Sequence, residues 1–274
     1  MTPMFDVPLN LSPSRVEAFL SCPMAFRFSS IERIPEPPAV HSTKGSLVHR
    51  ALELLFTQPA HERTLAAARV ATDAAITEYR TDPDFTGLHL SDAATDTFFA
   101  DCWSLVEGYF AMEDPTAVRD IGLELRLETS VGELGLRGII DRLDLDDEGG
   151  LVITDYKTGR TPGPQYAQGK MNGVHFYSYL CEQVLQQRPV AVRLMYLRSG
   201  ETITARPTDA SSRMLTQRTT AVWKAIASAC TSGNFQPKQG PLCNSCFYKS
   251  WCPAFGGDPE RARHEAPVHI QARA

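Results

Sequence analysis

The stretch GIIDRLDLDDEGGLVITDYKTG, residues 138–159, decides the fold. Two apolar runs flank a turn-forming segment at residues 146–150, and this pattern predicts two antiparallel strands joined in a hairpin. Asp141 and Asp155 are equally far from Glu148, the middle of that turn. We therefore expect the two aspartates to lie nearly opposite each other on neighbouring strands.

The second strand of this hairpin ends in Asp155-Tyr156-Lys157. Side chains two residues apart point to the same side of a strand, so the lysine should lie beside the carboxylate. Two carboxylates can hold Mg²⁺ or Mn²⁺ through oxygen ligands, and the backbone carbonyl of Tyr156 could add another. A lysine there can stabilise developing negative charge. The alternative for the tripeptide alone is an ordinary solvated ion pair.

Hydrophobic periodicity outside the hairpin predicts an α/β fold with a mixed sheet flanked by helices. Helices are expected over residues 12–22, 42–56, 61–80, 91–112, 165–187 and 209–232, and strands over 123–127, 134–145, 151–156, 190–197 and 201–206. We expect one domain over residues 1–274. It comprises an N-terminal helical part (12–120), a catalytic sheet core (121–206), a C-terminal helix with a cysteine-rich loop (207–256) and a polar tail (257–274).

Composition restricts the function classes. The 274-residue chain has a formal net charge of −5, which argues against a protein that coats nucleic acid but not against a metal-dependent nuclease. It has no apolar run long enough for a membrane span and no signal-peptide pattern, so we expect a cytoplasmic protein without membrane partners. The absence of a GxxxxGK[ST] motif means that any strand separation would need a helicase partner.

A histidine and a glutamate share one face of the helix expected over residues 42–56. His49 and Glu53 are one turn apart, and Gly45 lies one turn before His49. The glycine would allow close approach of backbone or substrate. Glu53 could orient the imidazole, or it could be an ordinary solvated glutamate.

Three of the seven cysteines are closely spaced near the C-terminus, at Cys243, Cys246 and Cys252. Such spacing suits a zinc ion or an iron–sulfur cluster, and three free thiols are the remaining alternative. A disulfide framework is not expected without a secretory signal. The cysteines at 102, 181 and 230 lie in apolar helical contexts and are interpreted as buried thiols.

Together these motifs resemble the RecB-type branch of the PD-(D/E)XK nucleases, which includes the RecB and AddB nuclease domains and the Fe–S exonuclease of CRISPR spacer acquisition. The resemblance covers residues 12 to about 255. It rests on Gly45-x-x-x-His49, Gly138-x-x-Asp141-Arg142 and Asp155-Tyr156-Lys157-Thr158-Gly159. It implies a restriction-endonuclease-like core with a mixed central sheet.

The resemblance also implies residue roles. The metal ligands would be His49, Asp141, Asp155 and the carbonyl of Tyr156, with Lys157 and the two aspartates as catalytic residues. Glu124 matches a glutamate on the preceding strand and is expected to play a supporting role.

In the Fe–S branch, an N-terminal cysteine joins a distant C-terminal trio to hold a [4Fe–4S] cluster. The matching residue here is Cys22, followed by Pro23. The cluster would then join the N- and C-terminal parts of the chain, with zinc as the alternative occupant.

One motif departs from the family pattern, in which Gln-x-x-x-Tyr follows the lysine and faces the DNA. Here Tyr177 is preceded by Gly173 and Tyr179 by His175, so the glutamine is absent in either register. His175 could replace it as a hydrogen-bond donor.

The expected activity is that of an Mg²⁺- or Mn²⁺-dependent exonuclease on single-stranded DNA ends, in DNA repair, recombination, or CRISPR or phage DNA processing. Partner proteins from those pathways are expected, and Arg142 and Arg160 are candidate phosphate contacts. The alternative is a non-catalytic DNA-binding or scaffold protein that keeps the nuclease fold.

Overall fold

The computed structural model describes residues 3–271, apart from the side chains of residues 164–172, 269 and 271. Contacts divide the chain into two units. Unit 1 contains the described parts of residues 1–37, 128–137 and 213–274, and unit 2 contains residues 38–127 and 138–212. The long strands of one hairpin and one long helix run through both units.

The sheet of unit 2 is mixed, as expected from the sequence. Its strands are β2 (Arg119–Val131), β3 (Leu134–Leu145), β4 (Leu151–Lys157), β5 (Ala191–Tyr196) and β6 (Glu201–Ala205). β2 pairs with β3, β3 with β4 and β5 with β6 in hairpin order, whereas β4 and β5 are parallel. Arg142 pairs with Thr154, which confirms the register predicted from the turn.

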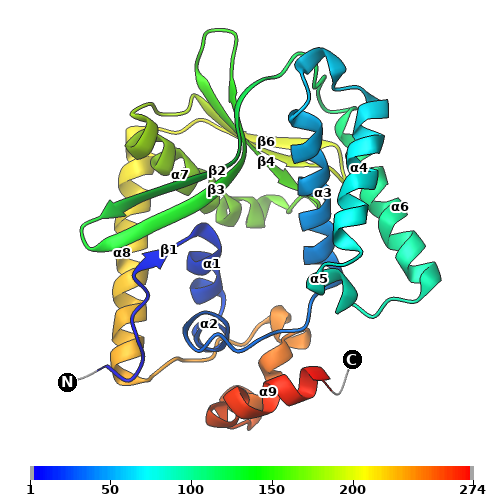
Figure 1. Cartoon of the computed structure of the whole chain (residues 1–274). Coiled ribbons are helices and arrows are strands. Elements are labelled where there is room, and N and C mark those ends of the chain that lie inside the picture. The colour runs from blue at the N-terminus through cyan, green and yellow to red at the C-terminus, as the bar shows by residue number, and fades with distance from the viewer. Residues whose placement is uncertain (1–2, 272–274) are drawn as a thin grey trace. The chain divides into compact units, whose positions relative to one another are not determined.

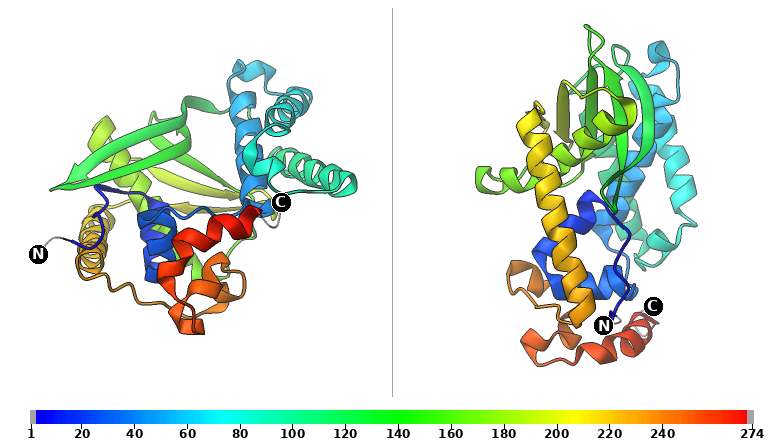
Figure 2. Two further views of the ribbon diagram at one scale, coloured as in Figure 1. Left: turned by 60° about the horizontal axis from the view of Figure 1, so that its bottom comes forward. Right: turned by 90° about the vertical axis from the view of Figure 1, so that its left-hand side faces the viewer.

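Three helices pack side by side in unit 2 (Figures 1 and 2). They are α3 (Val40–Phe56), α4 (Leu65–Tyr79) and α6 (Asp92–Tyr109), with the short α5 (Pro83–Thr86) and a 3-10 turn (Ala60–Glu62) between them. Their apolar faces enclose a core that also receives Tyr156, Met195 and Leu197. Because side chains alternate along a strand, Asp155 and Lys157 point away from that core.

A buried arginine lies beneath this sheet. Arg142 is fully buried and forms ion pairs with Asp144 at 2.7 Å and Glu113 at 2.6 Å. It also donates hydrogen bonds to the hydroxyls of Tyr156 at 2.6 Å and Tyr109 at 3.2 Å. These ion pairs and hydrogen bonds compensate the guanidinium for the loss of water, so that Arg142 can stay charged inside the core.

Unit 1 collects segments from both ends of the chain. Its elements are β1 (Asn10–Leu11), α1 (Pro13–Ser21), α2 (Pro23–Phe26), a π-helical turn (Arg27–Ile31), α9 (Ala262–Gln271) and the larger part of α8 (Asp209–Ser232). β1 pairs in parallel with the first residues of β3. Four 3-10 turns, Pro241–Asn244, Phe247–Trp251, Pro253–Phe255 and Pro259–Arg261, carry the cysteine-rich segment.

The structure confirms most of the predicted elements, including α1 and α7 (Pro164–Leu185). The side chain of Ser12 caps the start of α1 by accepting a hydrogen bond from the N–H of Arg15. Two elements are additional to those predicted. Within the polar tail, residues 262–271 form α9, where Ala262 and Ala266 are buried one turn apart. The second is the strand β1, which was not predicted because two residues are too few to show an alternation of apolar and polar side chains.

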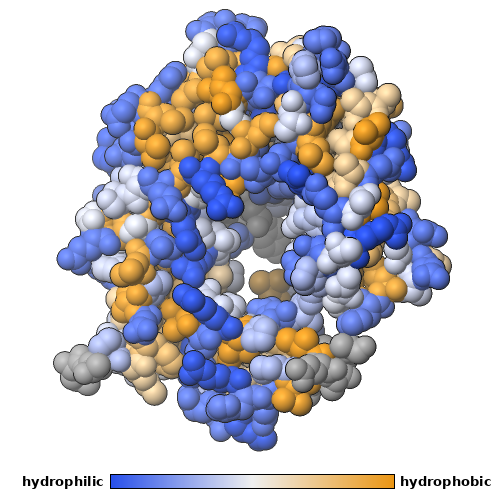
Figure 3. Space-filling model, viewed as in Figure 1, coloured by the Kyte–Doolittle hydropathy of each residue, from blue (hydrophilic) through white to orange (hydrophobic). Residues whose placement is uncertain are grey.

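The cysteines at 102, 181 and 230 are buried, as predicted. The face of the molecule in Figure 3 mixes hydrophilic and hydrophobic residues. Among the described residues, no helix is long and apolar enough to cross a membrane.

Replacing Arg142 by alanine should lower the free energy of unfolding by about 3–5 kcal/mol, because Asp144 and Glu113 would be left as buried, unpaired charges. Urea denaturation measures this change. Arg160→Ala is the matched control, since Arg160 is exposed and should change stability by less than about 0.5 kcal/mol. Equal effects of the two substitutions would contradict the structural role of Arg142.

Candidate functional site

His49 on α3 reaches the end of β4 and the carboxylate of Asp141 on β3. Its Nε2 lies 2.9 Å from the backbone carbonyl oxygen of Tyr156, and its Nδ1 lies 3.4 Å from Oδ2 of Asp141. The backbone N–H of Tyr156 donates to the same Oδ2 at 2.7 Å. The histidine, the aspartate and the carbonyl expected at one metal site therefore come together, all within unit 2.

Lys157 and Asp155 form an ion pair on the same side of β4, as the Asp-x-Lys spacing predicts. Lys157 Nζ lies 2.5 Å from Oδ2 of Asp155. The aspartate side chain is only 5% exposed, whereas the lysine side chain is 40% exposed. The ammonium group of Lys157 is therefore accessible to a substrate while it is paired with the buried carboxylate of Asp155.

Glu124 belongs to the candidate metal group more directly than its predicted supporting role implies. One ligand atom from each of His49, Glu124 and Asp141 lies within 4.8 Å of the others, and this is the one such group among the described residues. Asp155 does not belong to that group, so its place as a ligand stays a prediction. The backbone of Glu124 has a φ of 44°, a left-handed conformation that is rare in a strand and typical of a bulge.

The electrostatics of this site favour a cation. Burial and the charge of Asp141 raise the pKa of Glu124 to about 7. Burial and the charge of Asp141 also raise the pKa of Asp155, against the opposing effect of Lys157. Burial is the largest single effect on His49 and opposes its ionisation, but the hydrogen bond to Asp141 and the charges of Asp141 and Asp155 together outweigh burial and raise the pKa of His49. Several carboxylates that resist ionising together are what a divalent cation would stabilise.

A small pocket opens beside this group and is lined by His49, Glu53, Glu124, Asp141 and Tyr156, among others. Glu53 does not orient the imidazole as expected. Its carboxylate accepts a hydrogen bond from Arg50 at 2.9 Å, and the ring nitrogens of His49 face Asp141 and Tyr156 instead.

The two tyrosines considered for the Gln-x-x-x-Tyr position differ in their surroundings. Burial and the negative charges of Asp155, Asp141 and Glu124 raise the pKa of Tyr177. The carboxylates of the site therefore act electrostatically on the hydroxyl of Tyr177. The ring of Tyr177 packs closely on Gly138, where an added Cβ would lie 2.9 Å from Cε1.

His175 and Tyr179 lack that connection. Burial lowers the pKa of His175, and burial and Glu182 raise the pKa of Tyr179, without a contribution from the acidic group. The Tyr177 register therefore fits the site, and Gly173 is the residue in the place of the glutamine.

The two arginines proposed as phosphate contacts also differ. Arg142 is wrong as a phosphate contact, because its side chain is completely buried among its acidic and tyrosine partners. It supports the site from below by donating to the hydroxyl of Tyr156. Arg160 is exposed in the segment that follows β4 and stays a candidate.

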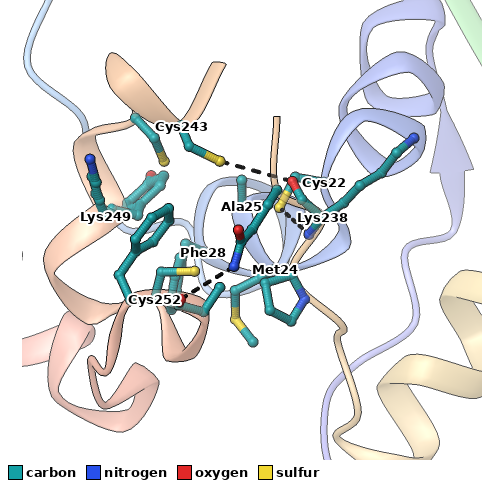
Figure 4. A pocket seen from close by; sticks show the side chains of 14 residues that line it. Cys22, Met24, Ala25, Phe28, Lys238, Cys243, Lys249 and Cys252 are labelled. Atoms are coloured by element: carbon teal, nitrogen blue, oxygen red, sulfur yellow. Dashed lines mark hydrogen bonds between the residues drawn. The ribbon is translucent and has the colours of Figure 1, made fainter. Parts of the chain in front are cut away.

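A second constellation lies within unit 1. The thiols of Cys22, Cys243, Cys246 and Cys252 line one pocket, and Figure 4 shows three of them, Cys22, Cys243 and Cys252, around it. Burial and the neighbouring thiols raise the pKa of Cys246 and of Cys252.

Backbone N–H groups point at two of these sulfurs. The N–H of Lys238 donates to Sγ of Cys22 at 3.5 Å, and the N–H of Gly240 donates to Sγ of Cys243 at 3.4 Å. Tyr248 fastens the cysteine segment to the N-terminal segment, because its hydroxyl donates to the carbonyl of Ile34 at 2.8 Å.

These four thiols are a donor set that two kinds of group use. A zinc ion and a [4Fe–4S] cluster can each be held by four cysteine thiolates, so the residues present fit either group.

Comparisons with known proteins agree with the fold. The PD-(D/E)XK nuclease superfamily matches residues 10–253. The crystal structure of a "putative exonuclease" from Eubacterium rectale superposes with a TM-score of 0.52 at 9% identity, covering 87% of each chain. The crystal structure of SSO0001 gives a TM-score of 0.42 at 14% identity, covering 91% of this chain and 88% of that one. No curated protein matches this sequence.

Binding of Mn²⁺ should tighten as the pH rises from 6 to 8. A cation must displace the proton that Glu124 holds below a pKa of about 7, so affinity should fall by up to about tenfold per pH unit below that value. Calorimetric titration measures this dependence. Glu124→Gln should weaken binding and flatten the slope, with His49 retaining the remainder.

Glu128→Gln, an exposed position on the same strand, is the control for Glu124→Gln. Affinity that is independent of pH in the parent protein, or an unchanged slope in Glu124→Gln, would exclude Glu124 from the metal group.

Proposed function

Because this chain belongs to the PD-(D/E)XK nuclease superfamily, we propose that it is a metal-dependent deoxyribonuclease acting as an exonuclease on single-stranded DNA ends. The observation that carries the proposal is the convergence of His49, Glu124 and Asp141 within 4.8 Å, beside the Asp155–Lys157 ion pair. A carboxylate-rich metal group next to a partly exposed lysine is suited to phosphodiester hydrolysis.

The donor set fits Mg²⁺ or Mn²⁺. His49, Glu124, Asp141, Asp155 and the carbonyl of Tyr156 would hold the cation. When bound, it would neutralise phosphate charge and make water a better nucleophile. The backbone of Tyr156 positions two of these donors. Its N–H donates a hydrogen bond to Asp141, and its carbonyl oxygen lies 2.9 Å from Nε2 of His49.

Lys157 supplies positive charge from the protein itself. Its ammonium group can donate to a phosphate oxygen and stabilise the negative charge that develops during hydrolysis. Tyr177 lies in the field of the same carboxylates and would contact the DNA strand or its end. Arg160, exposed after β4, would contact a neighbouring phosphate.

The preference for single-stranded ends and the pathway are further parts of the proposal. They are supported by the resemblance of the three motifs to RecB-type nucleases. Repair, recombination, or CRISPR or phage DNA processing would fit such an activity. A helicase or a CRISPR or recombination protein would supply the free strand.

We further propose that the four cysteines hold a [4Fe–4S] cluster. The proposal is supported by the four thiols that line one pocket, by backbone N–H donors to Cys22 and Cys243, and by the resemblance of the cysteine pattern to the Fe–S branch. The cluster would be structural, because it ties segments that are far apart in the sequence and so restricts the unfolded chain.

Lys157→Ala should reduce cleavage of DNA by about a hundredfold or more, because the substitution removes charge stabilisation in the transition state. End-labelled single- and double-stranded oligonucleotides, incubated with Mg²⁺ and Mn²⁺, measure rate, polarity and strand preference. Lys224→Ala, on the exposed face of α8, is the control and should cleave like the parent. DNA binding without cleavage by the parent would favour the non-catalytic alternative.

Anaerobically purified protein should contain about four iron atoms per chain, with broad visible absorption. Cys246→Ser should lose both, because a cluster ligand is removed. Cys230→Ser is the control, since Cys230 is a buried thiol outside the four and its Sγ donates to the carbonyl of Asp6. Zinc in place of iron would overturn this assignment without affecting the nuclease proposal.

A further inference from the structure

Tyr196, at the end of β5, has a buried hydroxyl without a partner. Its side chain is 3% exposed, and its hydroxyl oxygen has no hydrogen bond among the described residues. A hydroxyl buried in this way costs roughly 1–3 kcal/mol relative to a satisfied one. Phenylalanine would fill the same space without that cost, so packing alone does not explain the hydroxyl.

The position of Tyr196 links it to the Asp155–Lys157 pair. β4 and β5 are parallel, with Lys157 paired to Tyr196 and Asp155 paired to Leu194. Paired residues project from the same face of a sheet, so the tyrosine lies on the face that carries the lysine and the aspartate. Consistently, burial raises the pKa of Tyr196, and the charges of Lys157 and Asp155 both act on it.

The ion pair between Lys157 and Asp155 competes with cation binding. Without a cation, the buried carboxylate of Asp155 is held by the ammonium group at 2.5 Å. If Asp155 faces a divalent cation, the lysine is repelled and must find another acceptor. The oxygen of a phenol can accept such a hydrogen bond, and an ammonium group has three donors to offer.

We infer that Tyr196 is a positioning residue that receives the Lys157 ammonium group when Asp155 turns to a cation, and so aims the lysine at the phosphate. The inference rests on the proposed function and adds one residue to it. It also gives the unpartnered hydroxyl of Tyr196 a hydrogen-bond donor, namely Lys157, which is paired to Tyr196 across the sheet.

The first test is a double-mutant cycle on Mn²⁺ affinity, which needs no DNA. Electron paramagnetic resonance of free Mn²⁺ gives the dissociation constants of the parent, Tyr196→Phe, Lys157→Ala and the double variant. Tyr196→Phe should weaken binding several-fold in the parent, because the lysine then stays on Asp155. It should have no effect when Lys157 is alanine. Additive effects would overturn the inference.

The second test separates positioning from folding. Tyr196→Phe should lower kcat by about tenfold or more, as expected for loss of a hydrogen bond to a charged group, with little change in KM. Its thermal midpoint should be unchanged or higher, because no native hydrogen bond is lost. A lower midpoint with an unchanged kcat would show a structural role instead and overturn the inference.

Tyr79→Phe is the matched control, since it makes the same chemical change to a hydroxyl that interacts with Ser46. It should lower the thermal midpoint and leave kcat and Mn²⁺ affinity unchanged. If the parent binds Mn²⁺ but cleaves no DNA, the proposed function fails while the affinity cycle still decides the role of Tyr196. If the parent cleaves DNA and the cycle is additive, only the inference fails.

Discussion

The hydrogen bonds of Tyr156 are the constraint on which the metal group depends. Its N–H donates to Asp141, its carbonyl lies against His49, and its hydroxyl accepts from Arg142 in the core. One residue therefore couples a helix, two strands and a buried charge network. Because its side chain points into the core, strand alternation directs its neighbours Asp155 and Lys157 to the other face. The acidic site and the packed core are two sides of the same strand.

The sequence predicts much of this arrangement because local patterns dictate it. The turn at residues 146–150 sets the register of β3 and β4, and helical periodicity locates α3 with His49 on it. The roles of Arg142, Glu53 and Glu124 could not be predicted in the same way. An arginine that follows Asp141 could equally point outward, and only the positions of Glu113, Tyr109 and Tyr156 in space show that it is buried. The left-handed backbone at Glu124 has no sequence signature comparable to a glycine.

The cysteine group shows another limit of sequence reasoning. The spacing of Cys243 and Cys246 indicates a metal or cluster, but zinc and iron–sulfur sites share it. The partner Cys22 is more than two hundred residues away, and no local pattern connects them. The fold supplies the missing connection, because it brings Cys22 into the same pocket as the three C-terminal cysteines. The C-terminal α9 was likewise not predictable from its polar composition, since few of its residues are buried.

The left-handed backbone of Glu124 has a consequence for engineering this protein. A residue other than glycine in that conformation stores roughly 1–2 kcal/mol of strain. Glycine or asparagine would relieve it, so substitutions chosen only for thermostability would be drawn to this position. Each would discard a carboxylate of the candidate metal group. If Glu124 holds the cation as proposed, stability and metal binding are opposed at this one residue, and selection for a more robust protein would act against the metal site.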